Sequence, residues 1–178
     1  MKLESQEYQD DKTKKYLLAL NMIPYVGFKR ASKLIEHFGG NYENIFKIPP
    51  RTLADIAGIK KKFDYNPVEI LDKAEKELEL CDKQNVKVIS IKDDNYPDIL
   101  KEINSPPIIL YCKGDLNALN QISVSIVGTR KPSHLGIKNA TTLSKSLVKY
   151  NLTVTSGFAK GIDSAAHKGA LDAEGKTC

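Results

Sequence analysis

Three residues directly after an apolar stretch are suited to binding a phosphate. The stretch covers residues 122–127, and Gly128, Thr129 and Arg130 follow it. Glycine lets the backbone approach a ligand closely, a threonine hydroxyl is a hydrogen-bond donor, and arginine presents a planar fork of donors to phosphate oxygens. Lys131 adds a second positive charge beside them. The alternative interpretation is a tight turn with an exposed arginine.

A second turn with similar chemistry covers residues 156–161. It opens a helix, so its backbone amides, the helix N-terminus and a lysine are together suited to an anion. Phe158 is the candidate for stacking on a base, and the alternative is a buried anchor for the loop. Asp163 is expected to cap or orient the helix rather than to act as a base. The phosphate contacts predicted in this turn are Ser156, Gly157, Lys160 and Gly161.

Both turns are expected to meet at one edge of a parallel sheet. The pattern predicts strands over 122–127 and 152–155 and helices over 135–150 and 162–173. Such a connection leaves the carboxyl ends of both strands side by side, where open α/β sheets bind ligands. Because the chain stops at Cys178 before another strand is made, we predict an α/β fold with a truncated sheet, in a fragment of a longer protein.

The first part of the chain is predicted to be a small all-α domain. Helices are expected over 14–22, 28–38, 44–46 and 51–57. A charged helix over 67–85 and short strands over 86–91 and 108–111 are expected to follow. We therefore predict two domains, 1–66 and 67–178.

A third candidate for phosphate binding lies between the first two of these helices. Residues 23–31 predict a tight hairpin that presents backbone amides and two cations, and such a hairpin holds a phosphate without reading bases. It resembles the helix-hairpin-helix motif, which usually has glycine where this chain has Tyr25. A poorer second copy covers residues 53–59. The alternative is that both are packing corners of helices. The predicted hairpin contacts are Gly27, Lys29 and Arg30.

Composition and charge favour a globular protein with an anionic partner. The chain of 178 residues is 41% hydrophobic and carries a net charge of +5. Residues 1–120 hold 19 basic and 19 acidic side chains, whereas residues 121–178 hold 8 and 3, so the whole excess lies in the C-terminal segment. No apolar run has the length of a membrane span, and residues 1–10 lack the core of a signal peptide. We expect a cytoplasmic protein with no membrane partner.

The sequence contains no recognisable catalytic or cofactor-binding pattern. The three cysteines are far apart, and no histidine has a second ligand at metal spacing. The Gly-x-Gly-x-x-Gly pattern does not follow residue 127, and no acidic residue closes the strand 152–155 to hold a ribose. His167 is interpreted as a packed or surface residue. We predict no enzyme, no cofactor and no metal.

Several spaced motifs resemble the DNA-processing protein A family, also called DprA or Smf. The resemblance runs from about residue 94 to residue 177, and the helical opening fits that family's sterile-alpha-motif-like (SAM-like) N-terminal domain. Its Gly-Ser/Thr-Arg arginine, a phosphate contact, falls on Arg130. The motifs that carry the resemblance are Tyr96-Pro97, Pro106-Pro107, Lys113-Gly114-Asp115-Leu116, Val127 through Pro132, Ser156 through Asp163, and Ala165-Ala166-His167.

This resemblance implies an extended Rossmann-like sheet that binds single-stranded DNA. It also implies protection of incoming strands during natural transformation, loading of the RecA recombinase, and a homodimer in the full-length protein. One alternative is a nucleotide-processing enzyme of a related Rossmann-like fold, such as a phosphoribohydrolase. Another is a protein-interaction module built on the helical domain, which we rank last because its faces are charged.

Overall fold

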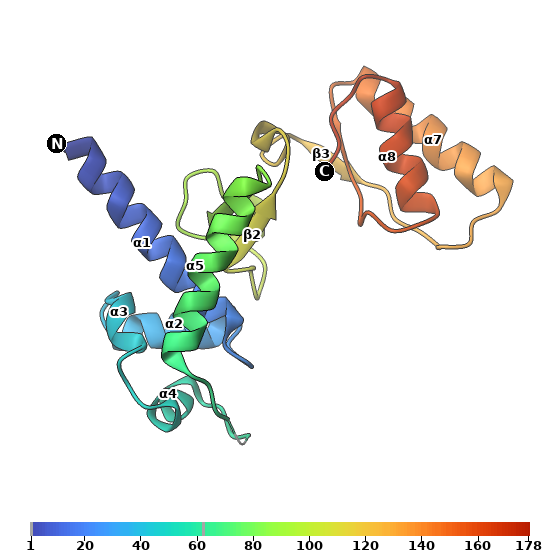
Figure 1. The fold of residues 1–178 in the computed structure, drawn as a ribbon. Helices are drawn as coiled ribbons and strands as arrows, with labels where there is room; N and C mark the ends of the chain where they lie inside the picture. Colours follow the sequence, from blue (N-terminus) through green and yellow to red (C-terminus); the bar gives the residue numbers. More distant parts are fainter. Residues whose placement is uncertain (1, 62) are drawn as a thin grey trace. The chain divides into compact units, whose positions relative to one another are not determined.

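The computed structural model describes residues 2–61 and 63–178 and divides into two compact units, Met1–Gly114 and Asp115–Cys178 (Figure 1). The fold combines helices with two small sheets, one antiparallel and one parallel. We describe each unit by itself, as unit 1 and unit 2. None of the described helices combines the length and apolar character needed to cross a membrane.

Unit 1 is built on five helices around one apolar core. They are α1 (Lys2–Met22), α2 (Phe28–His37), α3 (Tyr42–Ile45), α4 (Pro50–Ala57) and α5 (Pro67–Lys83). Leu17, Leu18 and Leu20 on α1 are fully buried, together with Leu34 of α2 and Leu53 of α4. Each such leucine stabilises the unit by about 2 kcal/mol through removal of apolar surface from water.

Helix α1 begins far before the predicted residue 14. The sequence of its first half has few apolar residues, so no hydrophobic period marks it, although Glu, Gln and Lys are good helix formers. Helix α3 also begins earlier than predicted, because the side chain of Asn41 accepts a hydrogen bond from the backbone amide of Asn44 at 3.2 Å. Helices α2 and α4 match their predicted spans within about one residue.

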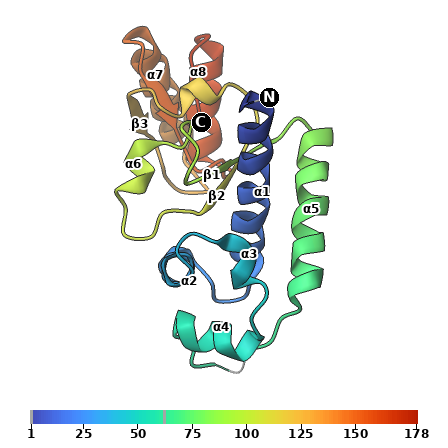
Figure 2. The same ribbon diagram turned by 90° about the vertical axis from the view of Figure 1, so that its left-hand side faces the viewer.

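Unit 1 continues past the predicted domain boundary at residue 66. Helix α5 runs beside α1 (Figure 2), and the antiparallel hairpin β1 (Lys87–Ser90) and β2 (Ile109–Cys112) shares their core through Val88, Ile108 and Ile109. Short helix α6 (Asp98–Lys101) lies in the connection between these strands. The compact unit therefore ends at Gly114. That residues 67–178 act as one DNA-binding domain stays a prediction.

Unit 2 carries the parallel strands that the sequence predicts. Its elements are the short helix η1 (Leu116–Ala118), β3 (Ser123–Ser125), α7 (His134–Lys149), β4 (Thr153–Thr155) and α8 (Ile162–Asp172). Strands β3 and β4 pair in parallel, with Val124 opposite Val154. Helices α7 and α8 pack closely because Gly169 approaches the backbone of Thr141, and the core between helices and sheet is made of small residues such as Ala140 and Ala166.

Two details of this sheet differ from the predictions. Strand β3 is shorter than the predicted 122–127, and its three residues are exposed, Val124 at 36%. The chain is predicted to end before another strand is made, and no strand follows α8 in the described residues, but the last residues form a contact that was not predicted. Thr177 forms a parallel bridge with Val154, and the amide of Cys178 donates to the carbonyl of Val154 at 3.0 Å. Strand β4 thus has a neighbour on each side.

Candidate nucleic-acid interface

The two predicted phosphate-binding turns lie next to each other at the carboxyl ends of β3 and β4. The Ile126 amide donates to the carbonyl of Thr155 at 2.9 Å, and the Ser156 hydroxyl donates to the carbonyl of Ile126 at 2.6 Å. These bonds fix the start of one loop to the start of the other. We call residues 128–132 the first loop and residues 156–161 the second loop. Their predicted adjacency is confirmed.

A buried carboxylate joins the two loops. Asp163, on the first turn of α8, is only 6% exposed. Its Oδ1 accepts the amide of Gly128 at 3.3 Å, and its Oδ2 accepts the amide of Ala159 at 3.4 Å. One side chain therefore holds backbone groups of both loops, and its contacts are those of an orienting residue, as expected. The sequence did not reveal that it also reaches the first loop, 35 positions away.

Glycines allow the backbones of the loops to touch. Gly161 has a φ of +94°, and a Cβ there would overlap the carbonyl oxygen of Thr129 and lie 2.9 Å from Cα of Arg130. The same carbonyl accepts the amide of Ile162 at 3.2 Å. Because L side chains rarely adopt this φ and no room exists for a Cβ, only glycine fits. This close approach places the backbone of the second loop directly against Arg130.

The cations of the loops are free of carboxylates. Arg130, Lys131 and Lys160 are exposed, and none forms an ion pair with a residue that the structure describes. Elsewhere in unit 2, Lys145 pairs with Asp172 at 3.6 Å. The charge excess of the C-terminal segment thus includes three unpaired cations on adjoining loops, an arrangement that favours an anion.

A second ion pair of unit 2 involves a perturbed carboxyl. The backbone amide of Asn117, and after it Lys176 at 3.4 Å, hold the pKa of Asp115 below its ordinary value. Asp115 and Lys176 are therefore engaged with each other, unlike the cations of the loops.

The hydroxyl of the first loop has a free donor for a ligand, whereas the hydroxyl of the second loop does not. The Thr129 hydroxyl accepts the amide of Lys131 at 3.1 Å, so its proton remains free for a ligand. Ser156 uses its hydroxyl on Ile126, and its amide donates to the carbonyl of Cys178 at 2.9 Å. Both donors of Ser156 are therefore occupied, and its role in this structure is to position the loop.

Phe158 is displayed at the surface of the second loop. Its side chain is 87% exposed, and its φ of +57° lies in the left-handed region, which costs a residue with a side chain roughly 1 kcal/mol or more. The ring meets that of His167 edge-on, with centroids 5.4 Å apart. The interpretation as a buried anchor is wrong, and the exposed ring remains a candidate platform for a base.

His167 is a packed residue, as one of its interpretations predicts. It is 8% exposed, and its Nδ1 lies 2.7 Å from the Thr177 hydroxyl. Since that hydroxyl donates to the carbonyl of Val154, Nδ1 is the donor to the hydroxyl oxygen. His167 thus ties α8 to the end of the chain. In the part of the chain that the structure describes, no three His, Cys, Asp or Glu side chains are grouped to hold a metal ion.

The predicted hairpin contacts Gly27, Lys29 and Arg30 belong to unit 1. Tyr25, which replaces the usual glycine, has a φ of +66° and so adopts the conformation that a glycine would have there. Arg30 stabilises the turn, because its Nη1 donates to the carbonyl of Tyr25 at 2.7 Å. The departure from the motif therefore leaves the turn intact.

Comparison with known proteins yields consistent matches. Residues 87–178 match the family described as DNA recombination-mediator protein A. Protein Smf of Synechocystis sp. is 33% identical over 175 residues, covering 91% of this chain and 42% of that protein. DNA processing protein DprA of Streptococcus pneumoniae is 43% identical over 94 residues, covering 53% of this chain and 33% of that protein.

The fold has a match among solved structures as well. The X-ray structure of DNA processing protein A from Streptococcus pneumoniae superposes with a TM-score of 0.61 at 32% identity, covering 91% of this chain and 54% of that one. The chain thus spans about half, or less, of the lengths of the relatives it matches.

Proposed function

Because the chain belongs to the DNA recombination-mediator protein A family, we propose that its two adjoining loops bind the sugar-phosphate backbone of single-stranded DNA. The observation that carries the proposal is the exposure of the Phe158 ring on a residue with a left-handed backbone conformation. This arrangement has two costs in the free protein. The left-handed backbone is strained, and the apolar ring is exposed to water. A base stacked on the ring would compensate for both.

The cations beside this ring suit a polymer better than a single nucleotide. Arg130, Lys131 and Lys160 lie on two strand ends, whereas the one carboxylate between the loops, Asp163, is buried and occupied by backbone amides. Because it is 6% exposed and each of its oxygens already accepts a backbone amide, Asp163 is not placed to hold a ribose as the acidic residue of a dinucleotide site does. The three cations suit repeating phosphates, and the Phe158 ring suits a stacked base.

The broader role follows from the family. The chain is proposed to act, as part of a longer protein, in DNA processing during natural transformation, in the cytoplasm, protecting single strands and aiding their transfer to the RecA recombinase. The full-length protein is proposed to be a homodimer. Unit 2 would be the beginning of a Rossmann-like sheet, and the helices of unit 1 a SAM-like domain. The activity is proposed to be non-enzymatic, and release of free base from a nucleoside monophosphate by the purified chain would contradict this.

Replacing Arg130 with alanine is expected to weaken binding of an oligothymidine about tenfold at low salt, because one charge-assisted phosphate contact is lost. The slope of log affinity against log salt concentration should flatten by about 0.7. Fluorescence anisotropy at several salt concentrations measures both. Lys145→Ala is the matched control, because it removes an equal charge from the same unit at a residue already paired with Asp172. Equal effects of the two variants would remove Arg130 from the site.

Replacing Phe158 with alanine is expected to lower oligothymidine affinity by about 1 to 3 kcal/mol, the contribution of one stacked base. Thermal stability should change little, since the ring is 87% exposed. Leu171→Ala is the control, because Leu171 is an exposed apolar residue on α8, 63% accessible. If Phe158→Ala binds as tightly as Leu171→Ala, the ring is not a platform for bases.

A further inference from the structure

Unit 1 contains a groove of about 400 Å³ to which both hairpin-like turns contribute. Gly27, Lys29, Arg30 and Lys33 line it from the start of α2, and Gly58 lines it from the end of α4. Helices α2 and α4 pack against each other in the core of the unit, which fixes the two turns relative to each other. The groove is therefore a built feature of the fold rather than a chance gap between loops.

The cations around this groove differ from most other lysines of the unit. Lys29 and Lys33 line the groove, whereas Lys60 and Lys61 follow its residue Gly58 along the chain. All four lysines are exposed and form no ion pair with any described residue. Arg30 uses one guanidinium nitrogen on the carbonyl of Tyr25 and has no carboxylate partner in the described part of the unit. We call the site lined by Lys29, Arg30 and Lys33 the basic groove.

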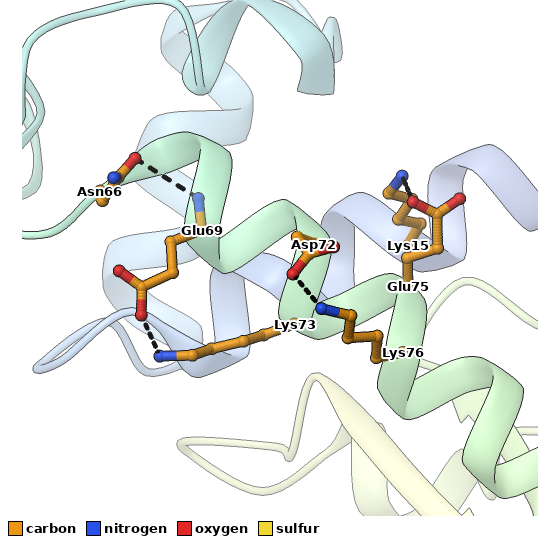
Figure 3. Close-up of polar contacts among 7 residues, drawn as sticks. All are labelled: Lys15, Asn66, Glu69, Asp72, Lys73, Glu75 and Lys76. Atoms are coloured by element: carbon orange, nitrogen blue, oxygen red, sulfur yellow. Dashed lines mark hydrogen bonds and ion pairs between the residues drawn. The ribbon is translucent and has the colours of Figure 1, made fainter.

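The lysines on the helices α1 and α5 are neutralised instead. Lys73 pairs with Glu69 at 2.6 Å, and Lys76 pairs with Asp72 at 2.7 Å, both one turn apart on α5 (Figure 3). The hydrogen bond to Asp72 raises the pKa of Lys76. Lys15 of α1 reaches Glu75 of α5 at 2.9 Å. Unit 1 thus carries paired charges along α1 and α5, whereas the cations that line the groove have no carboxylate partner among the described residues.

Backbone groups add to the positive potential of the groove. Helix α2 begins at Phe28, and its N-cap residue, Gly27, offers no side-chain acceptor to the first amides of the helix. These amides and the helix dipole favour an anion at this end. Tyr25 and Gly58 both have left-handed φ values, +66° and +68°, so the two turns expose their backbones in a similar way.

We propose that the basic groove binds the phosphate backbone of duplex DNA and is a second nucleic-acid site, separate from the loops of unit 2. Three lining cations, with Lys60 and Lys61 next to the second turn in the chain, suit a chain of phosphates better than one small anion. A duplex presents its phosphates outward and hides its bases, so it needs no aromatic platform. Phe28, the aromatic residue that lines the groove, is half-buried against the core, and the exposed Tyr25 ring of the same turn already contacts Lys61, whose Nζ lies 5.4 Å from its centroid.

The test compares two double variants of the 178-residue chain on two probes. Lys29→Ala with Lys33→Ala removes two unpaired cations of the groove, and Lys73→Ala with Lys76→Ala removes two paired ones from the same unit. The probes are a short duplex oligonucleotide and an oligothymidine, each titrated at several salt concentrations. Circular dichroism melting checks that both variants are folded.

The groove variant is expected to lose about tenfold or more of its duplex affinity and to flatten the duplex salt slope by about 1.8, which is the release of counterions from two phosphates. Its oligothymidine binding should be retained, and the control should match the parent chain on both probes. Arg130→Ala should show the opposite selectivity. The two probes therefore distinguish an error in the proposed groove site from an error in the proposed loop site.

Two results would overturn the proposal. One is duplex binding by the groove variant that equals that of the control. The other is an equal loss on both probes, because the groove would then not favour a duplex.

Discussion

Replacing Asp163 with alanine is expected to lower the free energy of unfolding of unit 2 by about 2 to 3 kcal/mol. The carboxylate is buried and accepts the amides of Gly128 and Ala159, and each bond to a charged group contributes roughly 1.5 kcal/mol at these long distances. Both amides lose their partner in the variant. Oligothymidine affinity should fall as well, because the bond network that holds the two loops together is gone.

Urea unfolding followed by circular dichroism measures the change in stability. Asp172→Ala is the matched control: its carboxylate is exposed and pairs only with Lys145 at 3.6 Å, so its removal should cost less than about 1 kcal/mol. Asp163→Asn should be intermediate, because the amide retains one acceptor oxygen. If Asp163→Ala is no less stable than Asp172→Ala, the carboxylate does not join the loops.

Replacing Gly161 with alanine is expected to be similarly severe, at about 2 to 5 kcal/mol. The left-handed φ of +94° costs a residue with a Cβ, and the added atom collides with Thr129 and Arg130 of the first loop. The loops can relieve the collision only by moving apart. We therefore expect a loss of oligothymidine affinity in addition to the loss of stability.

Gly136→Ala provides the contrast for this variant. Gly136 lies in α7, and a Cβ there would meet its neighbours at 3.5 Å or more, which is ordinary contact. Alanine is the better helix former, so this variant should be neutral or stabilised by up to about 1 kcal/mol. If both glycine variants melt alike, then the close approach at Gly161 does not constrain the loops.

The adjacency of the two loops could be predicted from sequence because it depends only on order and direction. Two strands joined by a helix run parallel and end at one edge, whatever their side chains. The contacts that lock the loops could not be predicted. From sequence, Asp163 is predicted only to cap or orient its own helix. Its hydrogen bond with Gly128 forms only when the two strands are paired. The same holds for Ser156, which resembles a ligand contact but serves the sheet.

Charge counting along the sequence was informative for unit 2 and misleading for unit 1. Equal numbers of basic and acidic residues over 1–120 suggest a neutral surface. In three dimensions Glu69, Asp72 and Glu75 of α5 form ion pairs with lysines of α1 and α5. Lys29 and Lys33 have no such partner among the described residues. A sum over sequence cannot detect this separation, because it depends on which helix faces meet.

The differences between the predicted and observed element boundaries also have a physical reason. The first half of α1 has too few apolar residues to show a hydrophobic period, so only its second part, residues 14–22, was predicted. The pairing of Thr177 with Val154 involves too few residues to show alternation. Elements that are short or have few apolar residues form mainly through backbone hydrogen bonds. Such bonds leave no periodic pattern of apolar side chains in the sequence.

The claim that the two loops form one DNA site is tested most directly by nuclear magnetic resonance. Backbone amide signals of the nitrogen-15-labelled chain would be followed during titration with a short oligothymidine. We predict that signals from Gly128 to Lys131 and from Gly157 to Gly161 shift together, with one common dissociation constant. Shifts confined to one loop, or two different constants for the two loops, would contradict the claim.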